Sequence, residues 1–81
     1  MAVRSPRRWG THFGRWVSGF GVPRLATSLG RAGHPTTASA IYEWVSGRNY
    51  PGRDRALEIQ RLSAGQVRLE DIYAHREQVR D

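Results

Sequence analysis

The chain contains no cysteine, which excludes a disulfide framework and a thiolate metal site. It also has no apolar run that approaches the roughly 18 residues of a membrane-spanning helix. No apolar segment of the signal-peptide type follows the arginine-rich start. A length of 81 residues is typical of one domain. We therefore expect one soluble, cytoplasmic domain without a membrane partner.

Lysine is missing as well, because all 13 basic residues are arginines. Residues 1–42 hold six arginines and no acid, whereas residues 43–81 hold seven arginines and seven acids. The entire net charge of +6 therefore lies in the first half, as is typical of proteins that bind a polyanion. A GC-rich codon bias would explain the missing lysines but not the missing acids. An organellar transit peptide is also rich in arginine and poor in acids, but the apolar periodicity from Trp9 onward favours a folded domain.

Hydrophobic periodicity predicts an all-α fold of about five short helices, and no segment alternates convincingly as a strand does. N-cap residues and helix-ending glycines place these helices at about residues 12–20, 22–30, 38–46, 53–63 and 69–79. We expect a flexible, arginine-rich arm over residues 1–10 and a folded domain over residues 11–81. Trp9 is expected on the apolar stripe of the first helix and Leu57 on that of the fourth. Val67 is expected to be a linker residue.

The second and third predicted helices form a helix–turn–helix candidate. Ala26 is small enough to allow a close crossing, and the apolar pair Ile41 and Trp44 would hold that crossing. The opposite side of the third helix is then free to enter a major groove, which is wide enough for one helix. Side chains near the start of such a helix reach base edges best. The predicted base-reading residues are Thr36, Thr37, Ala38, Ser39 and Tyr42.

Basic and polar side chains around this helix suit the phosphate backbone, where contacts set register more than sequence. The predicted backbone contacts in the folded domain are Arg31, Arg48, Asn49, Tyr50 and Arg53, with Arg55 as a possible extension. The arm adds Arg4, Arg7 and Arg8, which suit a narrow minor groove. For any one of these residues, a solvated basic loop is the alternative. Glu43 would repel phosphate, and we expect it to pair with a neighbouring arginine.

Four segments, "LATSLG", "AIYEWVSGRNYP", "RALEIQRLS" and "GQVRLEDIY", occur in this order. Together they resemble the repressor and Cro-type helix–turn–helix proteins of phages and bacterial operons, above all the short Cro-like and antitoxin-like members. The resemblance covers residues 22–73 and implies a lambda repressor-like bundle. It places the start of the recognition helix at residues 37–39, the core anchor at Trp44, and the phosphate-binding loop at Arg48 and Asn49.

The chain departs from this family in the turn between the two helices. Gly30 precedes Trp44 by fourteen positions, about five more than is usual in the family, whose turns are short. The segment "RAGHPTT" holds the additional residues. Either the second helix is extended or the turn is an enlarged loop, and either change could bring His34 or Arg31 to the DNA.

We predict a sequence-specific, double-stranded DNA-binding transcription regulator, a repressor or autorepressor of phage or bacterial origin that associates with the nucleoid. A homodimer is expected because one short helix reads too few base pairs for a specific site. Its predicted surface is Leu69, Tyr73 and Val79 on the fifth helix, for which closure of the core is the alternative.

Two other functions stay open. One is a protein-interaction module, such as an antitoxin or a phage-encoded inhibitor, that reuses the same fold. The other is a non-specific nucleoid protein. We do not expect an enzyme, a cofactor or a metal, because His12, His34 and His75 lie far apart and the glycines match no phosphate-binding loop. Each of these histidines is expected at the surface or at a helix cap.

Overall fold

The computed structural model of the protein describes residues 9–79, and these form five α-helices and no strand. The helices are α1 (His12–Phe20), α2 (Val22–Arg31), α3 (Ala38–Val45), α4 (Arg53–Leu62) and α5 (Leu69–Val79). The predicted all-α class and the order of the helices are confirmed. The predicted contacts of Arg4, Arg7 and Arg8 lie outside the described residues. Within the described range, no helix has both the length and the apolar character needed to cross a membrane.

The starts of α1 and α3 are set by threonine side chains that cap their free backbone N–H groups. The hydroxyl of Thr11 accepts a hydrogen bond from the N–H of Gly14 at 2.9 Å. The hydroxyl of Thr37 accepts one from the N–H of Ala40 at 3.1 Å. Both threonines have extended backbone angles, as N-cap residues do. The caps therefore define where the two helices begin.

The end of α2 explains the additional residues of the turn. Gly33 has a φ of 90°, and its N–H donates to the carbonyl of Gly30 at 3.0 Å. The N–H of His34 donates to the carbonyl of Leu29 at 2.9 Å, which completes a Schellman motif. The helix thus extends one residue beyond Gly30, and a connection over residues 32–37 follows it. This connection is longer than the three- to four-residue turn of a typical helix–turn–helix.

The core lies between all five helices and contains the apolar positions that the helical periodicity predicts. Ile41 and Trp44 on α3 are buried, and Ala26 on α2 packs half-buried against the same cluster. The other large members of the core are Phe13, Val17, Val22, Leu25, Leu29, Val45, Ile59, Val67 and Ile72. These contacts leave α3 with one buried side and one outward side.

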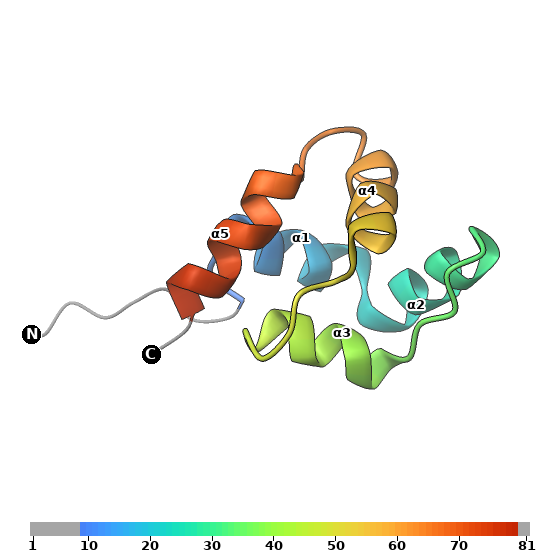
Figure 1. The fold of residues 1–81 in the computed structure, drawn as a ribbon, viewed down its shortest axis with the longest axis horizontal. Coiled ribbons are helices and arrows are strands. Elements are labelled where there is room, and N and C mark those ends of the chain that lie inside the picture. The colour runs from blue at the N-terminus through green and yellow to red at the C-terminus, as the bar shows by residue number, and fades with distance from the viewer. Residues whose placement is uncertain (1–8, 80–81) are drawn as a thin grey trace, which may run out of the picture.

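Figure 1 shows how the helices surround this core: α3 lies along the lower edge, α4 on the opposite side, and α1 behind α5. The main packing pairs are α1 with α5, α1 with α2, and α2 with α3. In addition, α5 contacts α3, so the last helix supports the one that is predicted to face DNA.

Three positions differ from the sequence-based expectations. Leu57 is 40% exposed, because α4 turns this residue away from its buried side at Ala56 and Ile59. Val67 is fully buried, because the hydroxyl of Ser63 accepts its N–H at 3.0 Å and directs the chain back to the core. His75 is a buried residue of the core rather than a surface or capping histidine.

Candidate nucleic-acid interface

The outward side of α3 carries four exposed side chains in two rows. Ala38 and Tyr42, four residues apart, form an apolar row. Ser39 and Glu43 form a polar row beside it. Ser39 and Glu43 lie opposite the buried side of α3, and Ala38 and Tyr42 lie at its flank, so all four are available to a partner.

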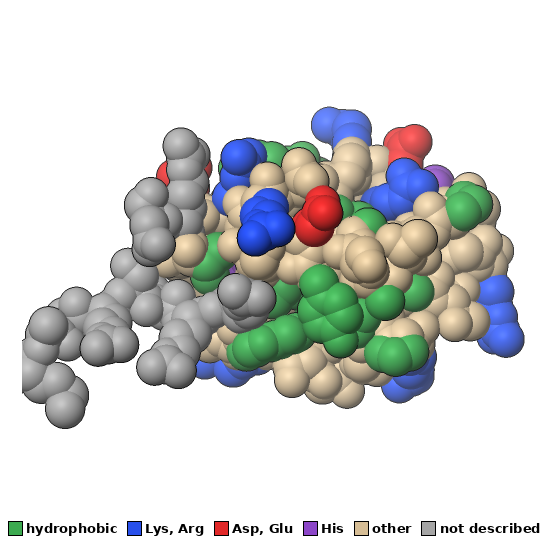
Figure 2. Space-filling view, turned by 90° about the horizontal axis from the view of Figure 1, so that it is seen from below, with side chains coloured by type: hydrophobic (Ala, Val, Ile, Leu, Met, Phe, Trp, Pro, Cys, Tyr) green, Lys and Arg blue, Asp and Glu red, His purple; other side chains and the backbone are tan. Residues whose placement is uncertain are grey.

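Trp9 packs against this face rather than on the apolar stripe of α1. Its ring meets that of Tyr42 edge-on, with centroids 6.4 Å apart and an interplanar angle of 85°. Trp9 is 38% exposed and Tyr42 is 49% exposed. Trp9 precedes the N-cap Thr11, and this position is the sequence signal that it cannot belong to the helical stripe. Figure 2, seen from the side of α3, shows hydrophobic side chains gathered in the middle of this face, with arginine and acidic side chains beside them and further arginines at its edges.

The enlarged turn before α3 is held by an arginine that the sequence reading assigned to DNA. The Nε of Arg55 donates to the hydroxyl of Thr36 at 2.9 Å, and a terminal nitrogen of Arg55 donates to the carbonyl of Pro35 at 2.7 Å. The hydroxyl of Thr36 donates in turn to the carbonyl of His34 at 2.6 Å. Arg55 and Thr36 therefore use their polar groups inside the protein. Neither residue is therefore retained as a DNA contact.

Three exposed arginines among the predicted backbone contacts have no acidic partner among residues 9–79. Arg31 is the last residue of α2, Arg48 follows α3, and Arg53 is the first residue of α4. Arg24 also has no acidic partner in this range, but its guanidinium lies over the ring of Phe20, 4.4 Å from the centroid. Arg31, Arg48 and Arg53 thus have charges that the described part of the protein does not neutralise.

Glu43 pairs with an amide and not with an arginine, which corrects the sequence-based expectation. The Nδ2 of Asn49 donates to the Oε1 of Glu43 at 2.7 Å. The chain can return in this way because Gly47, with a φ of 82°, ends α3 and turns Asn49 back toward the helix. The side-chain amide of Asn49 is therefore already engaged, and a carboxylate stays on the outward side of α3.

Tyr50 contacts α5, which joins a predicted backbone residue to the predicted dimer surface. Its ring meets that of Tyr73 edge-on at 5.1 Å. The guanidinium of Arg76 lies 4.5 Å from the centroid of Tyr50, and its Nε donates to the carbonyl of Gly47 at 3.2 Å. Arg76 therefore holds the segment that follows α3 against α5.

The predicted dimer residues lie in different environments on α5. Leu69 is half-buried and packs against the core, so core closure explains it. Tyr73 is 40% exposed, and Val79 is half-buried.

His75 fastens α5 to the start of α1 and the end of α3. Its Nδ1 accepts a short hydrogen bond from the hydroxyl of Thr11, while that hydroxyl also caps α1. Its Nε2 donates to the carbonyl of Val45 at 2.8 Å. Burial lowers the pKa of His75, and the bond to the Val45 carbonyl opposes that shift. Both ring nitrogens of the neutral form are satisfied, so this form fits the site. No spacing pattern in the sequence indicates this role.

Among residues 9–79, no group of three or more histidine or acidic side chains is arranged to hold a metal ion. No family model, curated protein or solved structure matches the chain.

Proposed function

We propose that the chain is a sequence-specific, double-stranded DNA-binding transcription regulator with a lambda repressor-like helix–turn–helix fold. It would act as a repressor or autorepressor. The observation that supports this proposal is the surface around α3. One side of this helix faces outward, and Arg31, Arg48 and Arg53, on the segments before and after it in the chain, have no acidic partner among the described residues.

In the proposed complex, α3 enters the major groove. Ala38, Ser39 and Tyr42 face the base edges, and Thr37 can donate its hydroxyl hydrogen while it continues to cap the helix. The three unpaired arginines lie on the segments that precede and follow α3 in the chain, from which they would contact the phosphate strands. The fully packed inner side of α3 fixes the direction in which these groups point.

A homodimer follows from the size of the interface. One eight-residue helix reads few base pairs, and two copies would read half-sites separated by about 34–36 Å. Tyr73 is the most exposed of the three predicted dimer residues and is the main candidate for this contact. Leu69 is not needed for it, because the core already accounts for its burial.

Duplex binding across a range of salt concentrations tests the function. If four to six phosphates are contacted, the logarithm of affinity should fall by about 0.9 per contact for each decade of salt. Selection from random-sequence duplexes should then yield a preferred site. Duplex binding without any preferred site would indicate a non-specific nucleoid protein, and an absence of duplex binding at low salt contradicts the proposal.

A second candidate function is a protein-interaction module, such as an antitoxin or an inhibitor. The outward side of α3 favours it in one respect, because the centre of this face holds Trp9, Tyr42 and the carboxylate of Glu43 instead of arginines. Aromatic side chains at the centre of a face are typical of protein-binding sites. A module of this kind would bind a protein through the aromatic pair and would bind duplex DNA weakly or not at all.

A further inference from the structure

We infer that α3 recognises thymine through its C5-methyl group, so that the preferred duplex sites place thymines against Tyr42 and Ala38. This inference rests on the proposed function, since it requires that α3 enter a major groove. It adds the class of base that the interface selects and the contact by which it does so.

The first support is the apolar row on α3. Ala38 and Tyr42 stand next to each other on the exposed side, and Tyr42 is one of the few large hydrophobic side chains that the fold leaves exposed. In the major groove, the thymine methyl is the apolar feature that distinguishes one base pair from another. An apolar row that enters the groove therefore has a matching group on thymine.

The second support is the shortage of free hydrogen-bonding groups at this face. Thr36 is bonded to His34 and Arg55, and the acceptor side of the Thr37 hydroxyl caps α3, so that only its hydrogen stays free. Asn49 is bonded to Glu43. Ser39 and Tyr42 then carry the exposed hydroxyls on α3 that have no partner among residues 9–79. Direct readout by hydrogen bonds at this face is therefore limited to a few hydroxyl groups, and the apolar row adds a second means of readout.

The third support is the way in which Trp9 holds Tyr42. The edge-on contact between the two rings limits the positions that the tyrosine side chain can take. A side chain that is already ordered loses less conformational entropy when it binds. Trp9 is accordingly a positioning residue, and Tyr42 is the residue that contacts the methyl group.

The test compares two duplex polymers that differ in the methyl group alone, alternating dA–dT and alternating dA–dU. We expect the protein to bind the thymine polymer more tightly, by about fourfold for each methyl group that is buried. Equal binding to both polymers contradicts the inference and leaves the proposed function intact. Binding to neither polymer nor to random-sequence duplexes at low salt contradicts both.

Variants then locate the contact. Tyr42→Ala should remove most of the preference for thymine over deoxyuridine, and Tyr42→Phe should retain it, because the ring rather than the hydroxyl makes the contact. Trp9→Ala should reduce the preference in part. Leu57→Ala is the matched control, since Leu57 is also a large exposed apolar residue but lies on α4.

Circular dichroism and thermal unfolding establish that each variant is folded before its binding is compared. A thymine preference that persists in folded Tyr42→Ala contradicts the assignment to Tyr42. A preference lost in folded Tyr42→Phe contradicts the methyl contact, because that variant keeps the ring.

Discussion

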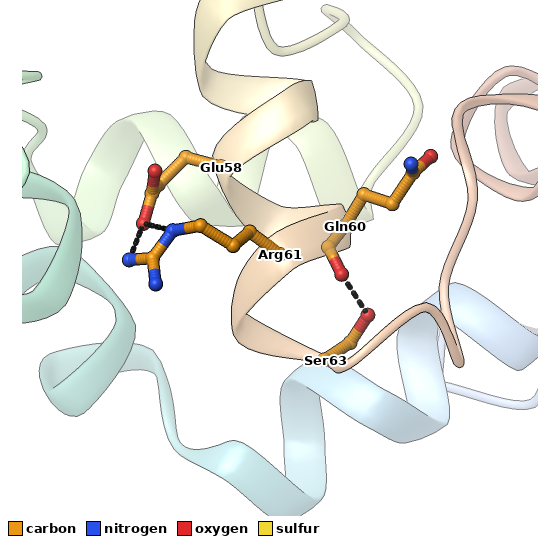
Figure 3. Close-up of polar contacts among 4 residues, drawn as sticks. All are labelled: Glu58, Gln60, Arg61 and Ser63. Carbon is orange, nitrogen blue, oxygen red and sulfur yellow. Dashed lines mark hydrogen bonds and ion pairs between the residues drawn. The ribbon is translucent and has the colours of Figure 1, made fainter.

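The arginines of residues 9–42 and those of residues 43–79 have different surroundings. Arg15, Arg24 and Arg31, in the first region, have no acidic partner among the described residues. In the second region, four arginines are held by carboxylates, a hydroxyl or backbone carbonyls: Arg55, Arg61, Arg68 and Arg76. Figure 3 shows one such pair on α4, where the Nε of Arg61 donates to the Oε2 of Glu58 at 2.9 Å. This contact lowers the pKa of Glu58.

This contrast shows that arginine has two roles in the described chain, in the fold or toward a partner, and that its neighbours determine which role it has. An arginine among acids and free carbonyls becomes part of the fold, whereas an arginine without them keeps its charge for a partner. Arg48 and Arg53 belong to the second region by sequence. By environment, however, they belong with Arg31, because they too are exposed and have no acidic partner in the described chain.

The second region also holds polar contacts of other residues in the fold, and the largest effect on stability is expected at the buried His75. His75→Ala should lower the free energy of unfolding by about 2–4 kcal/mol, because it opens a cavity and leaves the Thr11 hydroxyl and the Val45 carbonyl without their partner. Urea unfolding measures this change. Arg15→Ala, an exposed position of the first region, should stay within about 0.5 kcal/mol. Equal effects on the free energy of unfolding at the two positions would show that the buried contacts of His75 add nothing to stability.

Arg48 and Arg61 allow a direct comparison of an unpaired with a paired arginine. Replacing either one by alanine removes the same single positive charge. Arg48→Ala should weaken duplex binding about tenfold at low salt and reduce the slope of affinity against salt by about one phosphate contact. Arg61→Ala should leave binding nearly unchanged, because Arg61 is paired with Glu58 on α4. Fluorescence anisotropy with one labelled duplex measures both. If the two variants lose affinity equally, net charge alone drives binding and the positions of the arginines do not matter.

Protonation tests the same histidine without removing its ring. The pKa of His75 is lower in the folded chain than the ordinary value of 6.5, so the unfolded chain binds the proton more readily. The stabilising effect of the neutral ring is therefore complete above about pH 6.5 and is lost as the pH falls from there through the folded pKa. We expect the free energy of unfolding to decline as the pH falls below about 6.5, and His75→Gln to reduce this decline. If the unchanged protein and His75→Gln show the same dependence of unfolding free energy on pH, protonation of His75 does not cause the decline.

The helices could be predicted from the sequence because local groups define their ends. Thr11 and Thr37 cap the helices that they precede, and Gly33 and Gly47 adopt the positive φ that ends the helices before them. The class, number and order of the elements follow from such short-range signals. For the same reason, the apolar spacing located most of the core.

The polar contacts of the candidate site could not be predicted in this way. His75 pairs with Val45, which lies thirty positions earlier, and with Thr11, which lies sixty-four positions earlier. Arg55 reaches the turn before α3 from the start of α4. The hydrophobic periodicity of the sequence does not predict such partners, because these contacts depend on how the helices cross. Trp9 is similar, since its contact with Tyr42 depends on the path of the chain before α1.

The smallest effect on duplex affinity is expected at Glu43, which lies at the boundary of the two regions. Glu43 is the first acid of the chain and lies on the outward side of α3, among groups that would face DNA. Glu43→Gln keeps an oxygen for the amide of Asn49 and removes one negative charge from the interface. Affinity for duplexes of unrelated sequence should rise by up to about fivefold, which matches the roughly 1 kcal/mol of a close charge pair in water.

The direction of this effect also distinguishes two roles for the carboxylate. A carboxylate that only repels phosphate gives tighter binding to every duplex when it is neutralised, and the gain shrinks as salt rises. A carboxylate that accepts from a cytosine amino group gives weaker binding to the selected site alone. Measuring the variant on a selected site and on an unrelated duplex separates these outcomes. If affinity for both duplexes is unchanged at low salt, Glu43 does not approach DNA, and α3 does not enter the groove with the side proposed above.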